Sequence, residues 1–252
     1  MTRFYPAAAT DVNFPTIRIT GGAHTESEVE RVLKFIHIDS PSLASWYIVE
    51  GLLNNGDRRE GITIRNPHHN LNNAITNPTG GERNSDQPDS TPDDLLRNPG
   101  RGAGSTIDYY PWEWHQIGGG RPGAARDEIL MHELVHAYMI QRGISSVRRL
   151  QHARYARRLR RFDIVDDFFA IMITNVYASE CGRPIRRDHH GFQALNRNAM
   201  SVTMDPRFGK LFDALARAAP DLVAGLKSID TDFNPWHPKM DLIDAISVFD
   251  DA

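Results

Sequence analysis

The segment from His132 to His136, which reads His-Glu-Leu-Val-His, constrains the fold of this chain more than any other feature. It lies within residues 124–142, whose pattern predicts a helix that ends at Gly143. The four-residue spacing places both imidazoles on one face, about one helical turn apart. The neighbouring apolar residues are Ile129, Leu130, Leu134 and Val135. We therefore expect a buried helix, whose histidines and glutamate need polar or metallic partners.

Two imidazole nitrogens that converge in this way can hold one zinc ion. Bound zinc lowers the pKa of a water ligand to about 7, which provides a nucleophile at neutral pH. Glu133 is then placed to take a proton from the zinc-bound water. The sequence predicts a zinc-dependent hydrolase, with His132 and His136 as metal ligands and Glu133 as the base. A chance match in a surface helix is the alternative, and the apolar context argues against it.

A catalytic zinc site uses three protein ligands and leaves one position open. The metzincin extension is excluded, because Met139 and Arg142 stand where it requires glycine and histidine. The remaining candidates are carboxylates at the start of an apolar helix expected over residues 164–178, namely Asp163, Asp166 and Asp167. The N-terminus of a helix favours acidic residues through the macrodipole, and that interpretation explains one or two of them without a metal.

Helix facing selects Asp167 as the third ligand. It shares one stripe with Ala170, Ile171 and Thr174, and the small Ala170 lets the zinc helix come close. Asp163 lies one turn earlier, where it is expected to orient one of the two histidines. Asp166 points about 100° away on an ideal helix, so it is expected to cap the helix or face solvent. Asp163 and Asp166 stay open as alternative ligands.

The chain resembles the NleD-like effector zinc metalloproteases, which some bacterial pathogens inject into host cells. The resemblance spans about residues 28–192 and is interrupted by an Asn-rich insertion. The matching segments are HELVHA (132–137), Gly143, DDFFAIMITN (166–175) and GRPIR (182–186), preceded by FIHIDSPSLASWYIVEGLL (35–53) and GITIR (61–65). The resemblance implies an endopeptidase that acts on a protein substrate. It also implies a secreted effector or toxin. Because the N-terminal residues lack the apolar stretch of a secretory signal, we expect a protein made in the bacterial cytoplasm without a cleaved signal peptide.

The family has an Arg-x-x-Tyr motif after the Gly-x-Pro turn, and here Arg186 is followed three residues later by His189. The family tyrosine would stabilise the oxyanion of the tetrahedral intermediate, and a histidine N–H can do the same. The resemblance therefore assigns His189 a catalytic role. The family also has a Glu pair where Asp166 and Asp167 stand, so the shorter aspartate requires a closer helix.

The elements expected along the chain define a single α+β domain over residues 1–252. The resemblance implies that this domain is a zincin-like metalloprotease domain, in which helices predominate over a small mixed sheet. A polar insertion covers about residues 66–104, where apolar residues nearly vanish. We expect strands at 14–20, 61–65 and 106–112, and helices at 41–53 and 210–226. Thr25 and Glu28 predict a capping box at the start of another helix. Aromatic residues at 109–114 are expected to pack in the core or to line a substrate cleft at an edge strand.

Composition limits the classes of binding partner that we expect for this chain. The formal charge of -3 gives no sign of nucleic acid or of an anionic membrane, and no apolar run has the length of a membrane span. The single cysteine, Cys181, excludes a disulfide framework. Residues 147–161 contain seven arginines, which form either a solvated face or an exosite for an acidic or phosphorylated protein surface.

Two other functions stay open at this stage. One is a zinc hydrolase that acts on a small molecule. A deep closed pocket in the structure would favour this function. The other is a non-catalytic binding protein with a zincin fold. Glu133 argues against the latter, because a purely structural site has no use for a free carboxylate beside the metal.

Overall fold

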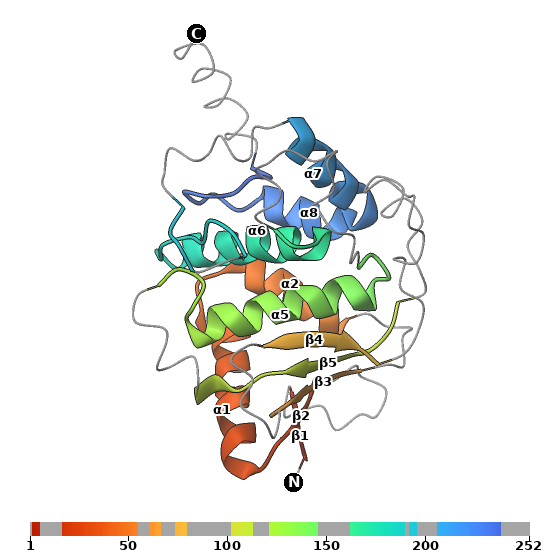
Figure 1. Ribbon diagram of the computed structural model, residues 1–252, viewed down its shortest axis with the longest axis vertical. Helices are drawn as coiled ribbons and strands as arrows, with labels where there is room; N and C mark the ends of the chain where they lie inside the picture. The colour runs from red at the N-terminus through yellow and green to blue at the C-terminus, as the bar shows by residue number, and fades with distance from the viewer. Residues whose placement is uncertain are drawn as a thin grey trace.

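The computed structural model has an α+β architecture, as the sequence predicts, with a small mixed sheet and a layer of helices (Figure 1). It describes residues 2–5, 17–54, 61–66, 74–79, 102–112, 121–145, 162–189, 192–195 and 206–237. The strands are β1 (Thr2–Tyr5), β2 (Ile17–Thr20), β3 (Ile62–Arg65), β4 (Ile75–Pro78) and β5 (Ser105–Asp108). The helices are α1 (Ala23–Lys34), α2 (Leu43–Leu53), α5 (Arg126–Gln141), α6 (Val165–Glu180), α7 (Pro206–Ala218) and α8 (Pro220–Lys227). A π-helical segment, Phe35–Asp39, continues α1.

The sheet has the strand order β1-β2-β3-β5-β4. Strands β2, β3 and β5 run parallel, and both outer strands pair antiparallel to their neighbours. In β2 and β3 the isoleucines alternate with polar residues, and Ile19 and Ile64 are fully buried. This alternation gives the sheet one apolar face, against which helices pack. Strand β4, an edge strand, comes from within the polar insertion.

Helix α5 forms the central layer, between the sheet on one side and α2 and α6 on the other (Figure 1). It contacts β4 and β5 as well as α1, α2 and α6, so nearly all its side chains are buried. A helix surrounded in this way needs apolar residues on every side, which its sequence supplies. The few polar side chains that it buries therefore belong to particular interactions, and these build the site described below.

Helices α5 and α6 lie side by side and antiparallel, and side-chain bonds join them at both ends. At one end, Tyr177 donates a hydrogen bond of 2.5 Å to Asp127, and Arg183 forms an ion pair of 2.6 Å with the same carboxylate. At the other end, Ser145 donates a hydrogen bond of 2.5 Å to Asp166. These bonds fix the relative position of the two helices that carry the candidate metal ligands.

Gly143 ends α5 as predicted. It has a φ of 68°, and the amides of Gly143 and Ile144 bond to the carbonyls of Ile140 and Met139, each at 3.0 Å. This is the Schellman arrangement, which requires a left-handed residue and therefore favours glycine. The C-terminus of the helix that carries His132 and His136 was thus predictable from a single residue.

Four structural expectations need correction. The capping box is wrong, because α1 begins at Ala23 and places Thr25 and Glu28 inside the helix. The expected strand 106–112 ends at Asp108, and it is an inner strand whose outer neighbour is β4. The expected helix 210–226 is divided in two, since Pro220 begins α8. The polar insertion also contributes a strand to the sheet.

Within the described residues, no helix is both long and apolar enough to cross a membrane. The basic segment 147–161 and the greater part of the polar insertion lie outside the described residues.

Candidate metal centre

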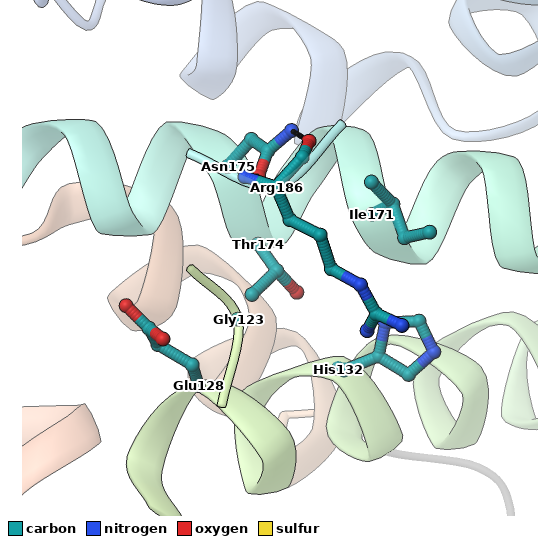
Figure 2. Close-up of a pocket in the computed structure, with 7 residues that line it drawn as sticks. All are labelled: Gly123, Glu128, His132, Ile171, Thr174, Asn175 and Arg186. Atoms are coloured by element: carbon teal, nitrogen blue, oxygen red, sulfur yellow. Dashed lines mark hydrogen bonds between the residues drawn. The ribbon is translucent and has the colours of Figure 1, made fainter. Parts of the chain in front are cut away.

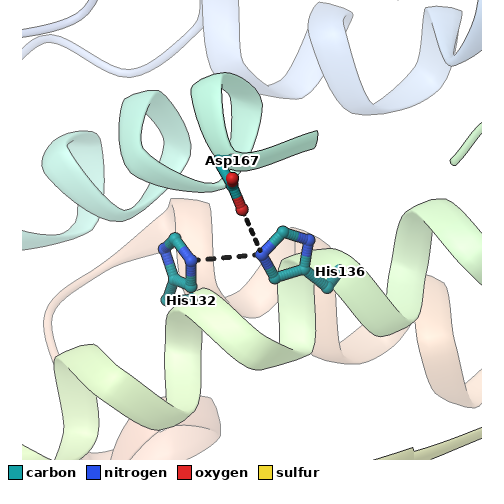
Figure 3. Close-up of side chains that lie close together, drawn as sticks. All are labelled: His132, His136 and Asp167. Carbon is teal, nitrogen blue, oxygen red and sulfur yellow. Dashed lines mark hydrogen bonds and ion pairs between the residues drawn. The ribbon is translucent and has the colours of Figure 1, made fainter. Parts of the chain in front are cut away.

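The two histidines of α5 converge as their spacing predicts (Figure 3). The Nε2 atoms of His132 and His136 lie 3.1 Å apart. Burial lowers the pKa of His136 to about 3, and burial together with His136 lowers the pKa of His132 well below its ordinary value. Both imidazoles are therefore neutral at ordinary pH, which is the form that binds metal ions.

Asp167, on the first turn of α6, faces this histidine pair across the helix interface (Figure 3). Its Oδ1 lies 3.5 Å from Nε2 of His136, and its Oδ2 accepts a hydrogen bond of 3.2 Å from the amide of Ile164. The three ligand atoms of His132, His136 and Asp167 lie within 4.8 Å of one another. These three residues form a group that could hold a metal ion, with His132 and Asp167 buried and His136 partly buried.

Glu133 lies beside this group with its side chain buried. Its Oε2 is 2.7 Å from the hydroxyl of Thr76 on β4, and the same hydroxyl lies 3.1 Å from the Glu133 carbonyl oxygen. Burial raises the pKa of Glu133 to about 7, with a further contribution from the negative charge of Asp167 and an opposing one from the Thr76 hydrogen bond. A carboxyl with this pKa can both accept and release a proton near neutral pH.

His189 lies on the loop after α6 and reaches the same site. Its ring stacks on that of His132, with centroids 5.9 Å apart and an interplanar angle of 23°. Its Nε2 lies 3.8 Å from Oδ1 of Asp167, and its Nδ1 is 2.8 Å from Oδ2 of Asp163. The structure therefore brings His189 next to the histidine pair and turns its Nε2 towards the candidate ligands.

Asp163 orients a different histidine from the one expected. The sequence predicts that it supports His132 or His136, whereas its carboxylate bonds to His189. Asp163, Asp167 and His189 form a second group with metal-ligating side chains, which shares Asp167 with the first. Because Asp163 and His189 already satisfy each other at hydrogen-bond distance, we interpret this group as an Asp–His pair beside one metal site.

The expectation that Asp166 could face solvent is wrong. Its side chain does not face solvent but is buried, 2% exposed, and accepts the hydrogen bond from Ser145 that joins α6 to the end of α5. The angular argument correctly separated Asp166 from Asp167. It could not show what lies on the other side of α6, because that depends on the packing of distant segments.

Thr76 and Arg186 reach the site without having been assigned a role from the sequence. Thr76 lies in the Asn-rich insertion, where the short segment Ala74 to Thr76 was the only local sign of a strand. Arg186 lies in the Gly-Arg-Pro-Ile-Arg segment, and it lines a pocket with His132. Both come to the site through pairing and packing over long sequence distances.

Comparison with models of protein families, with curated proteins and with solved structures gave no match.

Proposed function

We propose that this protein is a zinc-dependent endopeptidase that hydrolyses a protein substrate, and that it acts as a secreted bacterial effector or toxin. The observation that carries the enzymatic part is the convergence of His132, His136 and Asp167 beside the buried carboxyl of Glu133. The effector part rests on the sequence resemblance to the NleD-like proteases.

The donor set fits zinc. Two imidazole nitrogens and one carboxylate oxygen are ligands that zinc accepts in catalytic sites, where a fourth position stays open. Zinc bonds of about 2.0–2.1 Å in a tetrahedron place two ligand atoms roughly 3.3 Å apart. The distances of 3.1 Å from His136 Nε2 to His132 Nε2 and 3.5 Å to Asp167 Oδ1 agree with this spacing.

Bound zinc would supply a Lewis acid that lowers the pKa of water and polarises a substrate carbonyl. Glu133 would then accept a proton from the attacking water on its free carboxylate oxygen and deliver it to the leaving amine. A base works best when its pKa lies near the operating pH. In the metal-free protein burial raises the pKa of Glu133 to about 7, and the positive charge of bound zinc would lower it from there.

As an imidazolium, His189 would donate its Nε2–H to the oxyanion that forms on the substrate carbonyl, because its Nδ1–H already donates to the Asp163 carboxylate. The hydrogen bond between its Nδ1 and Asp163 fixes the ring orientation. Asp163 therefore acts through His189, as a residue that positions the donor. Preorganised donors of this kind stabilise the transition state because they need no reorientation during the reaction.

Strand β4 favours a protein substrate over a small molecule. It pairs with β5 along one edge, and no other described strand pairs with its second edge. Thr76 of this strand contacts Glu133, so the edge runs past the proposed base. An extended peptide can add to such an edge through main-chain hydrogen bonds. The pocket beside His132 is far smaller than the roughly 300–1,000 Å³ of typical small-molecule sites.

The test is labelling of new N-terminal amines in lysates treated with the zinc-loaded protein, with a Glu133→Gln variant as the matched control. We expect a small set of new termini with the wild type and none with the variant, although both bind zinc. Equal sets of termini would show that Glu133 is not the base. Zinc binding without any new terminus in candidate host lysates would contradict the proposed proteolysis.

A further inference from the structure

A small pocket between α5 and α6 opens beside His132 (Figure 2). Glu128 and His132 line it from α5, Thr174 and Asn175 line it from α6, and Arg186 crosses it from the following loop. In Figure 2 the guanidinium of Arg186 lies next to the His132 ring, with Thr174 between Arg186 and Glu128. The pocket therefore adjoins His132, one of the proposed metal ligands.

Arg186 is held firmly in the pocket. Asn175 fixes its backbone, with its amide donating to the Arg186 carbonyl at 2.7 Å and its oxygen accepting from the Arg186 N–H at 2.8 Å. The guanidinium donates one hydrogen bond to the His189 carbonyl and lies 4.5 Å from the centre of the Phe192 ring. Its stem packs over Gly123, where a β-carbon would lie 2.6 Å from Arg186 Cδ. The cation therefore stays in place without a substrate.

Two hydrogen-bonding groups in the pocket have no partner among the described residues. They are the hydroxyl of Thr174, whose residue is 6% exposed, and the Nε–H of Arg186, which is also buried. An arginine N–H can only donate, so the group that satisfies it must be an acceptor. Within the described part of the chain, Arg186 also forms no ion pair with a carboxylate. Burial lowers the pKa of Arg186 despite the negative charges of Asp188, Asp167 and Glu128 nearby, so an anionic ligand would further stabilise its charged form.

We propose that this pocket binds the carboxylate of an aspartate or glutamate side chain of the substrate, directly beside the bond that is cleaved. This inference rests on the proposed endopeptidase function and specifies its substrate. The carboxylate would accept from the Nε–H of Arg186 and from the Thr174 hydroxyl. A carboxylate carries only acceptors when ionised, which matches two unused donors.

Glu128 on the opposite wall does not exclude an anion. Its carboxylate accepts from the amide of Ala125 at 3.3 Å and lies 3.5 Å from Arg183, so it already has partners. Burial raises the pKa of Glu128, which makes its neutral form more accessible and weakens its repulsion of a second carboxylate. A substrate asparagine or glutamine would fill the same space but would bring no negative charge to Arg186.

The first test is the cleavage of a proteome-derived peptide library by the zinc-loaded full chain. We expect aspartate and glutamate to be enriched at one position adjoining the cleaved bond, about tenfold or more over asparagine and glutamine. Arg186→Gln should abolish the enrichment, and Thr174→Val should weaken it. Arg187→Gln is the matched control, because it removes the same charge from a side chain that pairs with Asp188, outside the pocket.

The second test needs no turnover, so it separates this inference from the proposed function. Metal-free protein is titrated with N-acetyl-aspartate amide and with N-acetyl-asparagine amide by calorimetry. We expect the aspartate probe to bind about tenfold more tightly, and Arg186→Gln to remove the difference. Equal binding of the two probes, or an acidic preference in library cleavage that persists in Arg186→Gln, would overturn the proposal. Peptide cleavage without any acidic preference would also overturn it, while leaving the protease function intact.

Discussion

At the scale of single residues, the buried carboxyl of Glu133 couples the stability of the metal-free protein to pH. Its pKa in the folded state, about 7, lies above the ordinary value of 4.5. The folded state therefore binds more protons than the unfolded state between these values, and stability falls as pH rises through this window. Above pH 7 the full cost of burying the charge is present, about 3 kcal/mol for a shift of this size.

Glu133→Gln removes this charge and keeps an acceptor for Thr76. We expect the metal-free variant to exceed the metal-free wild type in free energy of unfolding by about 1–3 kcal/mol at pH 8, with the difference vanishing near pH 4. Urea denaturation at both pH values measures it. Glu28→Gln is the control, and we expect it to lower the free energy of unfolding at pH 8. The reason is that the hydrogen bond from Arg31 lowers the pKa of Glu28 in the folded state. A wild type more stable than Glu133→Gln at pH 8 would show that the carboxylate is not penalised by burial.

His189 and Asp163 are expected to act as one unit in turnover. Loss of an oxyanion donor costs on the order of 100-fold in kcat, so His189→Ala should lose about this much with zinc content unchanged. Asp163→Asn should lose less, and the double variant should be no slower than His189→Ala, because Asp163 acts only through His189. Asp188→Asn serves as the control, since Asp188 pairs with Arg187. Additive losses, or zinc lost in His189→Ala, would refute these roles.

At the scale of secondary-structure elements, α6 stabilises the start of α2 as well as carrying Asp167. The carboxylate of Glu180, near the end of α6, accepts hydrogen bonds from the Ser42 hydroxyl at 2.6 Å and from the amides of Leu43 at 2.9 Å and Ala44 at 3.1 Å. These are the amides that a helix N-terminus leaves without an intrahelical partner. Helix α2 in turn packs on both α5 and α6, so this cap stabilises a helix that contacts both helices of the site.

Glu180→Ala should therefore lower the free energy of unfolding by about 1–3 kcal/mol, as expected for a lost helix cap with charge-assisted hydrogen bonds. Thermal or urea denaturation measures the loss. Asp39→Ala is the comparison, because Asp39 is exposed and lies 3.8 Å from an exposed Lys34. A change at Glu180 as small as that at Asp39 would mean that solvent caps α2 equally well.

The elements closest to the metal centre were the ones most readable from sequence. The apolar pattern and Gly143 predicted α5, and the stripe through Asp167 and Ala170 placed Asp167 towards the histidines. Thr76 was not predictable, because β4 has no buried alternating face and exists through its pairing with β5. The partners of Asp163 and Asp166 likewise depend on how segments remote in sequence come together, which local periodicity does not encode.

At the scale of the whole molecule, the candidate site lies where three parts of the fold meet. Helix α5 provides two histidines and Glu133, α6 with the loops on either side provides Asp167, Asp163 and His189, and the sheet edge provides Thr76. The hydrogen bonds and ion pair that join α5 to α6 hold the ligands together before any metal binds. Metal binding therefore needs little reorganisation of the backbone, and zinc should stabilise the folded chain by mass action.

The zinc content of purified chains, after reconstitution and dialysis against a competing chelator, tests the metal centre most directly. Asp167→Ala and Asp166→Ala form a matched pair, because both residues are buried in the same turn and only Asp167 faces the histidines. We predict about one zinc per chain in the wild type and in Asp166→Ala, and at least a tenfold loss of zinc affinity in Asp167→Ala. A wild type without zinc, or zinc kept by Asp167→Ala and lost by Asp166→Ala, would contradict the proposed site.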